Sequence, residues 1–258
     1  MMSHPVATDL PSIIEEAYRV FSGYRPEKIL NVCHCDVCID PESERALLAT
    51  PLRQISSKML ARYTDAVSAG ADDVRFDELR YFLPRYLELI AANDPPDDMG
   101  YNICLRRLQE SIWRTAWPAE QVAVIERFFD AYLASSLTNV DLCQWPAGWA
   151  LRFPLGDVLT MIATAGGDVE RVLQIWETAP DPGAALHMAA LRSDLTGGPE
   201  WRLIDAHLSP DFRAAALAIG TFLAREAVDA RLETVFFSLE DERHQKIVSD
   251  ATWTIYNT

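Results

Sequence analysis

Basic side chains are scarce in this sequence. Its 258 residues include 23 Lys and Arg against 38 Asp and Glu, which gives a formal net charge of −15. A field of that sign repels phosphate groups, and the basic residues form no stripe that offsets it. The charge therefore argues against nucleic acids and anionic membrane surfaces as partners.

Long apolar runs and cysteines are scarce as well. No stretch reaches the roughly 18 to 20 apolar residues that span a bilayer, and residues 1–11 lack the basic start and apolar core of a secretory leader. Five cysteines, an odd number, make no disulfide framework for a chain of this length. We expect a soluble, cytoplasmic protein whose thiols are free or bound to metal.

The apolar content is high enough for an ordered core. Hydrophobic residues make up 49% of the chain and aromatic residues 10%. They recur with the helical period of about 3.6 residues, and no run alternates convincingly with the period of a strand. We predict an all-α protein with helices at residues 10–21, 41–49, 57–69, 74–91, 101–115, 118–137, 155–165, 168–178, 183–193, 200–207, 210–226, 229–237 and 240–256.

Local signals mark where several of these helices begin. Asp40 is the predicted N-cap of the second helix, and Ser56 or Ser57 of the third. Asp168 has the same role after a pair of glycines. Pro84 falls inside the apolar stripe of the fourth helix. Because proline lacks a backbone N–H and its ring is bulky, we predict that the helix is kinked or divided there.

Short links join the predicted helices, and short links favour antiparallel neighbours. The expected architecture is a stack of antiparallel helical hairpins, either a bundle or an irregular α-solenoid. The helical pattern fails between Thr138 and Pro154. We therefore place the boundary of two halves there, 1–138 and 139–258, with the halves packed as one continuous unit.

Two tryptophans, Trp145 and Trp149, lie in that irregular stretch. Pro146 and Gly148 between them interrupt any regular pattern. Because an indole ring buries a large apolar area, we expect both rings to fold onto the protein as a plug rather than to be presented to a partner.

The densest chemical feature is the sequence Cys33-His34-Cys35-Asp36-Val37-Cys38. Cys35 and Cys38 have the spacing with which two thiolates hold one zinc ion, and Cys33 or His34 can supply a third ligand. Packing in a loop is the interpretation that the sequence favours, with metal binding and thiol redox chemistry as alternatives. A fourth metal ligand would come from the isolated residues Cys104, Cys143, His187, His207 and His244.

Other chemical signatures are weak. The sequence contains no metalloprotease helix, nucleophile elbow or phosphate-binding glycine loop. Arg53, Arg80 and Arg85 form an anion site only if their helices meet, and pairing with acidic side chains of the chain is the expected outcome. Asp241 and His244 are spaced to share a metal, but the charged residues around them predict a solvated helix face.

Several short sequence motifs lie between residues 35 and 89. They are Cys35 with Cys38, Pro41-Glu42, Pro51-Leu52-Arg53, Phe82-Leu83-Pro84-Arg85 and Leu87-Glu88-Leu89. In this order they resemble a group of uncharacterised bacterial proteins. The resemblance implies an all-helical bacterial protein and brings no activity with it. Cys33 is an addition to the pattern of that group.

High acidity, a predicted helical stack and the absence of a catalytic motif favour a binding protein. We expect a protein-binding or accessory protein whose acidic face covers a basic partner protein, for example a toxin that it neutralises. The alternative is a metal- or thiol-dependent enzyme or sensor that uses the cluster from Cys33 to Cys38, with zinc as the candidate metal.

Overall fold

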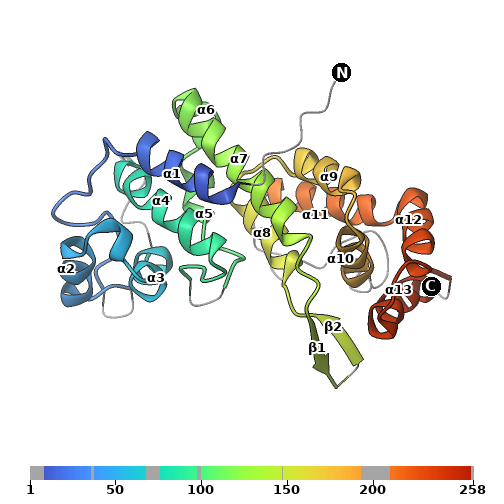
Figure 1. Cartoon of the computed structure of the whole chain (residues 1–258). Helices are drawn as coiled ribbons and strands as arrows, with labels where there is room; N and C mark the ends of the chain where they lie inside the picture. The colour runs from blue at the N-terminus through green and yellow to red at the C-terminus, as the bar shows by residue number, and fades with distance from the viewer. Residues whose placement is uncertain are drawn as a thin grey trace. The chain divides into compact units, whose positions relative to one another are not determined.

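The structure is a computed structural model that describes residues 9–35, 38–67, 76–97, 100–146, 148–192 and 210–256 (Figure 1). Within these residues the chain is mostly helical, with one two-stranded hairpin, so the predicted helical fold class is confirmed. None of the helices found there is long and apolar enough to cross a membrane.

Thirteen α-helices and one 3-10 turn, η1 (Leu52–Gln54), lie in the described ranges. The helices are α1 (Leu10–Val20), α2 (Pro41–Ala49), α3 (Ser57–Asp65), α4 (Asp77–Ala91), α5 (Arg106–Glu110), α6 (Trp113–Ala116), α7 (Ala119–Ser136), α8 (Leu155–Thr164), α9 (Val169–Thr178), α10 (Pro182–Arg192), α11 (Pro210–Leu223), α12 (Glu226–Phe236) and α13 (Glu242–Tyr256). The predicted helix at 200–207 lies outside the described residues.

Three of the predicted N-caps are confirmed. The side chain of Asp40 accepts two backbone N–H groups from the first turn of α2, both at 2.9 Å. Ser56 accepts one from α3 at 3.2 Å, and Asp168 accepts one from α9 at 3.1 Å. Each bond satisfies a donor that the helix itself leaves without a partner, so these residues decide where the helices begin.

The chain divides by its internal contacts into two compact units. In the described ranges, the N-terminal unit comprises residues 9–132 together with 160–167. The C-terminal unit comprises 133–159 and the described residues after 167. The division falls inside α7 and inside α8.

In the N-terminal unit, α4 packs against α1. Phe82, Leu83 and Leu87 of α4 are completely buried, as is Ala17 of α1. The helix continues through Pro84 without a break, so the predicted division is wrong. Burial of the apolar side chains around Pro84 stabilises one continuous helix, which offsets the loss of a backbone hydrogen bond.

Two other predicted helices are shorter than the apolar pattern indicates. α3 stops at Asp65, and Val67 lies beyond it with an exposed side chain. The predicted helix at 101–115 is replaced by turns and by α5 and α6. Ile112 between them has a φ of 44°, in the left-handed region, where a helix cannot continue. Apolar spacing reports which side chains are buried, and it does not report this backbone turn.

In the C-terminal unit, α10 packs against α11, α12 and α13. Its small residues Ala184, Ala185 and Ala189 are buried and allow neighbouring elements to come close. A Cβ atom on Gly183 would collide with the carbonyl oxygen of Leu137, just after α7. The first turn of α10 therefore requires glycine at this position.

The C-terminal unit also contains a β-hairpin where the sequence predicted an irregular loop. β1 (Leu142–Trp145) and β2 (Gly148–Leu151) pair antiparallel, with Leu142 opposite Leu151 and Trp145 opposite Gly148. Four-residue strands are too short to show a clear alternating pattern, which explains why the sequence did not reveal them.

The two hairpin tryptophans lie on opposite faces, because Trp149 pairs with Gln144, the neighbour of Trp145. Trp149 is 39% exposed, and the guanidinium of Arg243 lies 5.0 Å from its ring centre. Trp145 is 61% exposed, and its Nε1–H donates to the Cys143 sulfur at 3.1 Å within the same strand. The predicted plug is therefore wrong: Trp145 is presented to solvent.

Candidate metal centre

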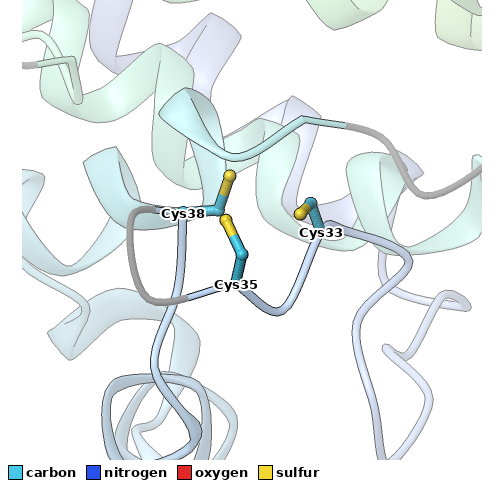
Figure 2. Close-up of side chains that lie close together, drawn as sticks. All are labelled: Cys33, Cys35 and Cys38. Carbon is cyan, nitrogen blue, oxygen red and sulfur yellow. The ribbon is translucent and has the colours of Figure 1, made fainter.

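The cysteine loop, residues 33–38, lies between α1 and α2 in the N-terminal unit. The sulfur atoms of Cys33, Cys35 and Cys38, here called the cysteine triad, all lie within 4.8 Å of one another, and Figure 2 shows the side chains converging. None of the three takes part in a disulfide, and Cys35 is exposed. Across the described ranges, no other set of His, Cys, Asp or Glu gathers in a comparable way.

Apolar residues hold both ends of the cysteine loop. Leu30 and Val32 precede it and Ile39 follows it, and all three are buried. Inside the loop, the backbone N–H of Cys38 donates to the carbonyl oxygen of Cys35 at 3.1 Å. This turn brings the two thiols of the C-x-x-C spacing to the same place.

Glu44, near the start of α2, is a polar anchor for the loop. Only 7% of the residue is exposed. Its Oε1 accepts the backbone N–H of Leu30 at 2.6 Å and a hydrogen bond from Nε2 of His34 at 3.0 Å. Because a buried carboxylate is costly without donors, these two bonds explain how Glu44 is accommodated.

A second carboxylate and one backbone bond hold the strand-like segment before the loop. Glu78 of α4 accepts the N–H of Asn31 at 3.0 Å, and burial raises the pKa of Glu78. The N–H of Cys33 donates to the carbonyl oxygen of Val67 at 2.6 Å. Arg107 secures the segment that contains Val67, since its Nη2 donates to two carbonyl oxygens around the end of α3 at 2.8 and 2.6 Å. The position of Cys33 is therefore fixed by three neighbouring elements.

The thiols of the cysteine triad influence one another. The pKa of Cys33 is raised above its ordinary value, chiefly by a hydrogen bond with the Cys35 thiol and further by one with Cys38. Such bonds favour the protonated form. A metal ion that binds here must displace these protons.

The spacing of the cysteine triad suits one metal ion. Three thiolates that hold zinc tetrahedrally at about 2.3 Å have sulfur atoms about 3.8 Å apart. The observed separations of up to 4.8 Å exceed that value by about 1 Å, which small side-chain rotations can remove. The three sulfurs are thus close enough to bind a single ion together.

His34, predicted as an alternative to Cys33 for the third ligand, does not join the triad in this structure. Its ring is directed to Glu44, and its nitrogens lie outside the group of ligand atoms that come within 4.8 Å of one another. His34 therefore ties the loop to α2 and does not join the sulfur atoms of the triad.

The isolated residues proposed as a further ligand also lie elsewhere. Cys104 is buried, and burial raises the pKa of its thiol. Cys143 accepts the indole N–H of the hairpin. His187 and His244 each hydrogen-bond a backbone carbonyl oxygen at the base of the hairpin, at 3.0 Å. His207 lies outside the described residues.

The three arginines considered as an anion site pair with acidic side chains, as predicted. Arg53 contacts both carboxylate oxygens of its partner, at 2.9 and 2.7 Å. The bonds of Arg80 and Arg85 measure 3.1 and 2.6 Å. The partners, in the same order, are Glu15, Asp77 and Glu88.

Asp241 and His244 do not form a metal pair. Asp241 precedes α13, and its hydrogen bonds with the Arg243 side chain and backbone hold its pKa well below the ordinary range. His244 is turned to the carbonyl oxygen of Val140 instead. Both groups thus have hydrogen-bond partners within the protein.

Comparison with known proteins assigns nothing further to this site. The chain matches no protein family, no curated protein and no solved structure. A function must therefore be inferred from the arrangement of the residues themselves.

Glu44 and Glu78 are the functional residues that sequence reasoning missed. Both occur in the first turn of a helix, where an acidic residue is ordinary and solvated. Their burial depends on the loop that folds over them. The apolar residues Leu30, Val32 and Ile39 beside the cysteines were the available signal, because they indicate that the loop is packed against the helices.

Proposed function

We propose that the protein binds one thiophilic metal ion, zinc, through the thiolates of the cysteine triad. The observation that carries the proposal is the convergence of three sulfur atoms within 4.8 Å, on a loop whose preceding backbone is bonded to two buried carboxylates. Ligands that the fold itself brings together lose less conformational entropy when an ion binds. Thiolate ligands favour zinc or copper(I) over calcium and magnesium.

The solvent-facing position of Cys35 distinguishes this site from a metal centre inside a core. An ion there can enter and leave without unfolding of the surrounding helices. Reversible loading of this kind is typical of a metal sensor. The proposal therefore takes up the sensor alternative of the sequence analysis.

Zinc content tests the proposal directly. Protein purified without chelators and under reducing conditions should contain one equivalent of zinc, and Cys38→Ser should reduce it to a trace. The matched control is Cys143→Ser, which removes a thiol that already has a partner in the hairpin. Wild-type protein that is folded by circular dichroism but takes up no zinc on reconstitution contradicts the proposal.

A second candidate function is protein binding through the hairpin. One observation supports it: Trp145 is 61% exposed in a β-hairpin, and exposed tryptophans are frequent anchors of interfaces. The net charge of −15 favours a basic partner, with association that weakens as salt is raised. Binding of the partner must be lost both in the Trp145→Ala variant and at high salt. If the variant still binds the partner, the hairpin is not the binding site.

A further inference from the structure

We propose that the cysteine triad is an open metal site, in which the fourth coordination position is left to an external small thiol. This inference rests on the proposed function, because it concerns the ion held by the same three sulfurs. Structural zinc sites are closed by four protein ligands, whereas sites that act on other molecules supply three and keep one position exchangeable.

The first argument is the direction of His34. This residue is the nearest nitrogen ligand in sequence, between two members of the triad, yet its Nε2 donates to Glu44 at 3.0 Å. To reach the ion, His34 would have to leave this partner.

The second argument is the cost of that movement. Glu44 is 7% exposed and accepts only backbone N–H and imidazole donors among the bonds described, those of Leu30 and His34. If His34 left, the buried carboxylate would lose one of them, and a charge-assisted hydrogen bond is stronger than a neutral one. His34 is therefore a positioning residue that ties the loop to α2.

The third argument concerns the fourth coordination position. Among the described residues, no further ligand atom of His, Cys, Asp or Glu comes within 4.8 Å of all three sulfurs. Cys35 is exposed, so an ion bound to its sulfur can be reached from solvent. A water molecule fills that position by default, and a sulfur ligand is favoured over water by a thiophilic ion.

Exchange at this position is chemically balanced without a redox partner. The bond from the ion to water breaks and a bond from the ion to the thiol sulfur forms. The thiol proton passes to bulk solvent, and no electrons are transferred. Coordination to the ion lowers the pKa of the incoming thiol, so the exchange proceeds near neutral pH.

Cobalt(II) is the probe, because it occupies tetrahedral zinc sites and its spectrum reports each ligand. The full chain is reconstituted with one equivalent of cobalt(II) without oxygen, with a phosphine as reductant, and 2-mercaptoethanol is then added. We expect the cobalt bands to shift while cobalt stays with the protein after desalting. His34→Ala should give the same initial spectrum and the same shift, with about tenfold weaker cobalt binding because a supporting hydrogen bond is lost.

Three outcomes overturn the open site. Cobalt bands that do not change when the thiol is added show a site closed by the protein, and an initial spectrum altered by His34→Ala identifies His34 as a ligand. Loss of cobalt from the protein to the thiol is the third. A complete absence of cobalt–thiolate bands in the wild type refutes metal binding itself, which separates failure of the proposed function from failure of this inference.

Discussion

The cysteine loop and the β-hairpin are both irregular segments of a helical protein, and opposite chemistry holds them in place. Before the loop, the backbone N–H groups of Leu30 and Asn31 donate to buried carboxylates. Before the hairpin, the carbonyl oxygens of two successive residues accept from His187 and His244. In each irregular segment, side chains from neighbouring helices thus supply the partners that its backbone groups lack within the segment itself.

The thiols of the two regions differ in their partners, because the backbone around them is held in different ways. Cys143 lies in a strand that supplies its own partner, the indole N–H of Trp145. In the cysteine loop, the external anchors fix the backbone and leave the cysteine triad with one another as neighbours. Cysteine chemistry in this protein is therefore decided by how the surrounding backbone is held.

The largest expected effect is a loss of stability in acid that arises at the hairpin, from His187. Burial lowers the pKa of His187 to about 4 from the ordinary value of 6.5. Below pH 6.5 the unfolded chain binds this proton and the folded chain does not, so stability falls as pH falls. At about 1.4 kcal/mol per pH unit, the loss by pH 4 is about 3 kcal/mol. For Glu78, whose pKa is raised, the sign is reversed.

Urea unfolding at pH 7 and pH 4.5 measures this effect. His187→Gln retains a donor for the carbonyl oxygen of Asn139 but has no group that titrates, so its loss of stability on acidification should be smaller than that of the wild type. Equal losses in the two proteins would show that His187 is not the acid-sensitive anchor of the hairpin.

Removing one anchor of the cysteine loop is expected to have the next largest effect. Glu44→Ala leaves the buried N–H of Leu30 and the ring of His34 without an acceptor, which costs about 2 kcal/mol of unfolding free energy. The control is Glu42→Ala, an exposed residue of the same helix, with a change within about 0.5 kcal/mol. Similar values for the two variants would remove Glu44 from the role of anchor.

The smallest effects distinguish the two faces of the hairpin. Trp149→Ala removes the contact with Arg243 and costs about 1 kcal/mol, whereas Trp145→Ala costs less than about 0.5 kcal/mol because the ring is exposed. Thermal melts of both variants provide the measurement. The reverse order would mean that Trp145 is the buried ring in solution.

The helices could be predicted well where a cap and an apolar stripe agree. Asp40, Ser56 and Asp168 are such cases, since capping depends on residues next to the helix start. The interruption at Ile112 could not be predicted, because a β-branched residue in the left-handed region is an exception to its local preference. Only the tertiary structure imposes that conformation.

The candidate site could be predicted in part. The spacing of Cys35 and Cys38 pointed to a shared ion, with Cys33 or His34 as the third ligand, and in the structure it is Cys33 whose sulfur lies with theirs. The direction of His34 was not visible in the sequence, because it depends on Glu44 being buried under the loop. The sequence favoured a protein-binding role, and the convergence of the thiols is what moves our proposal towards metal binding.

The separation along the chain of the bonded residues sets the order in which the two regions can form during synthesis. Glu44 follows Leu30 by 14 residues and Glu78 follows Asn31 by 47, so the loop and both acidic anchors leave the ribosome before the hairpin. His244 follows Val140 by 104 residues. Closing so long a segment is slow, and the hairpin must wait for its second histidine. A nascent chain can therefore present a finished cysteine loop while the base of the hairpin is still incomplete.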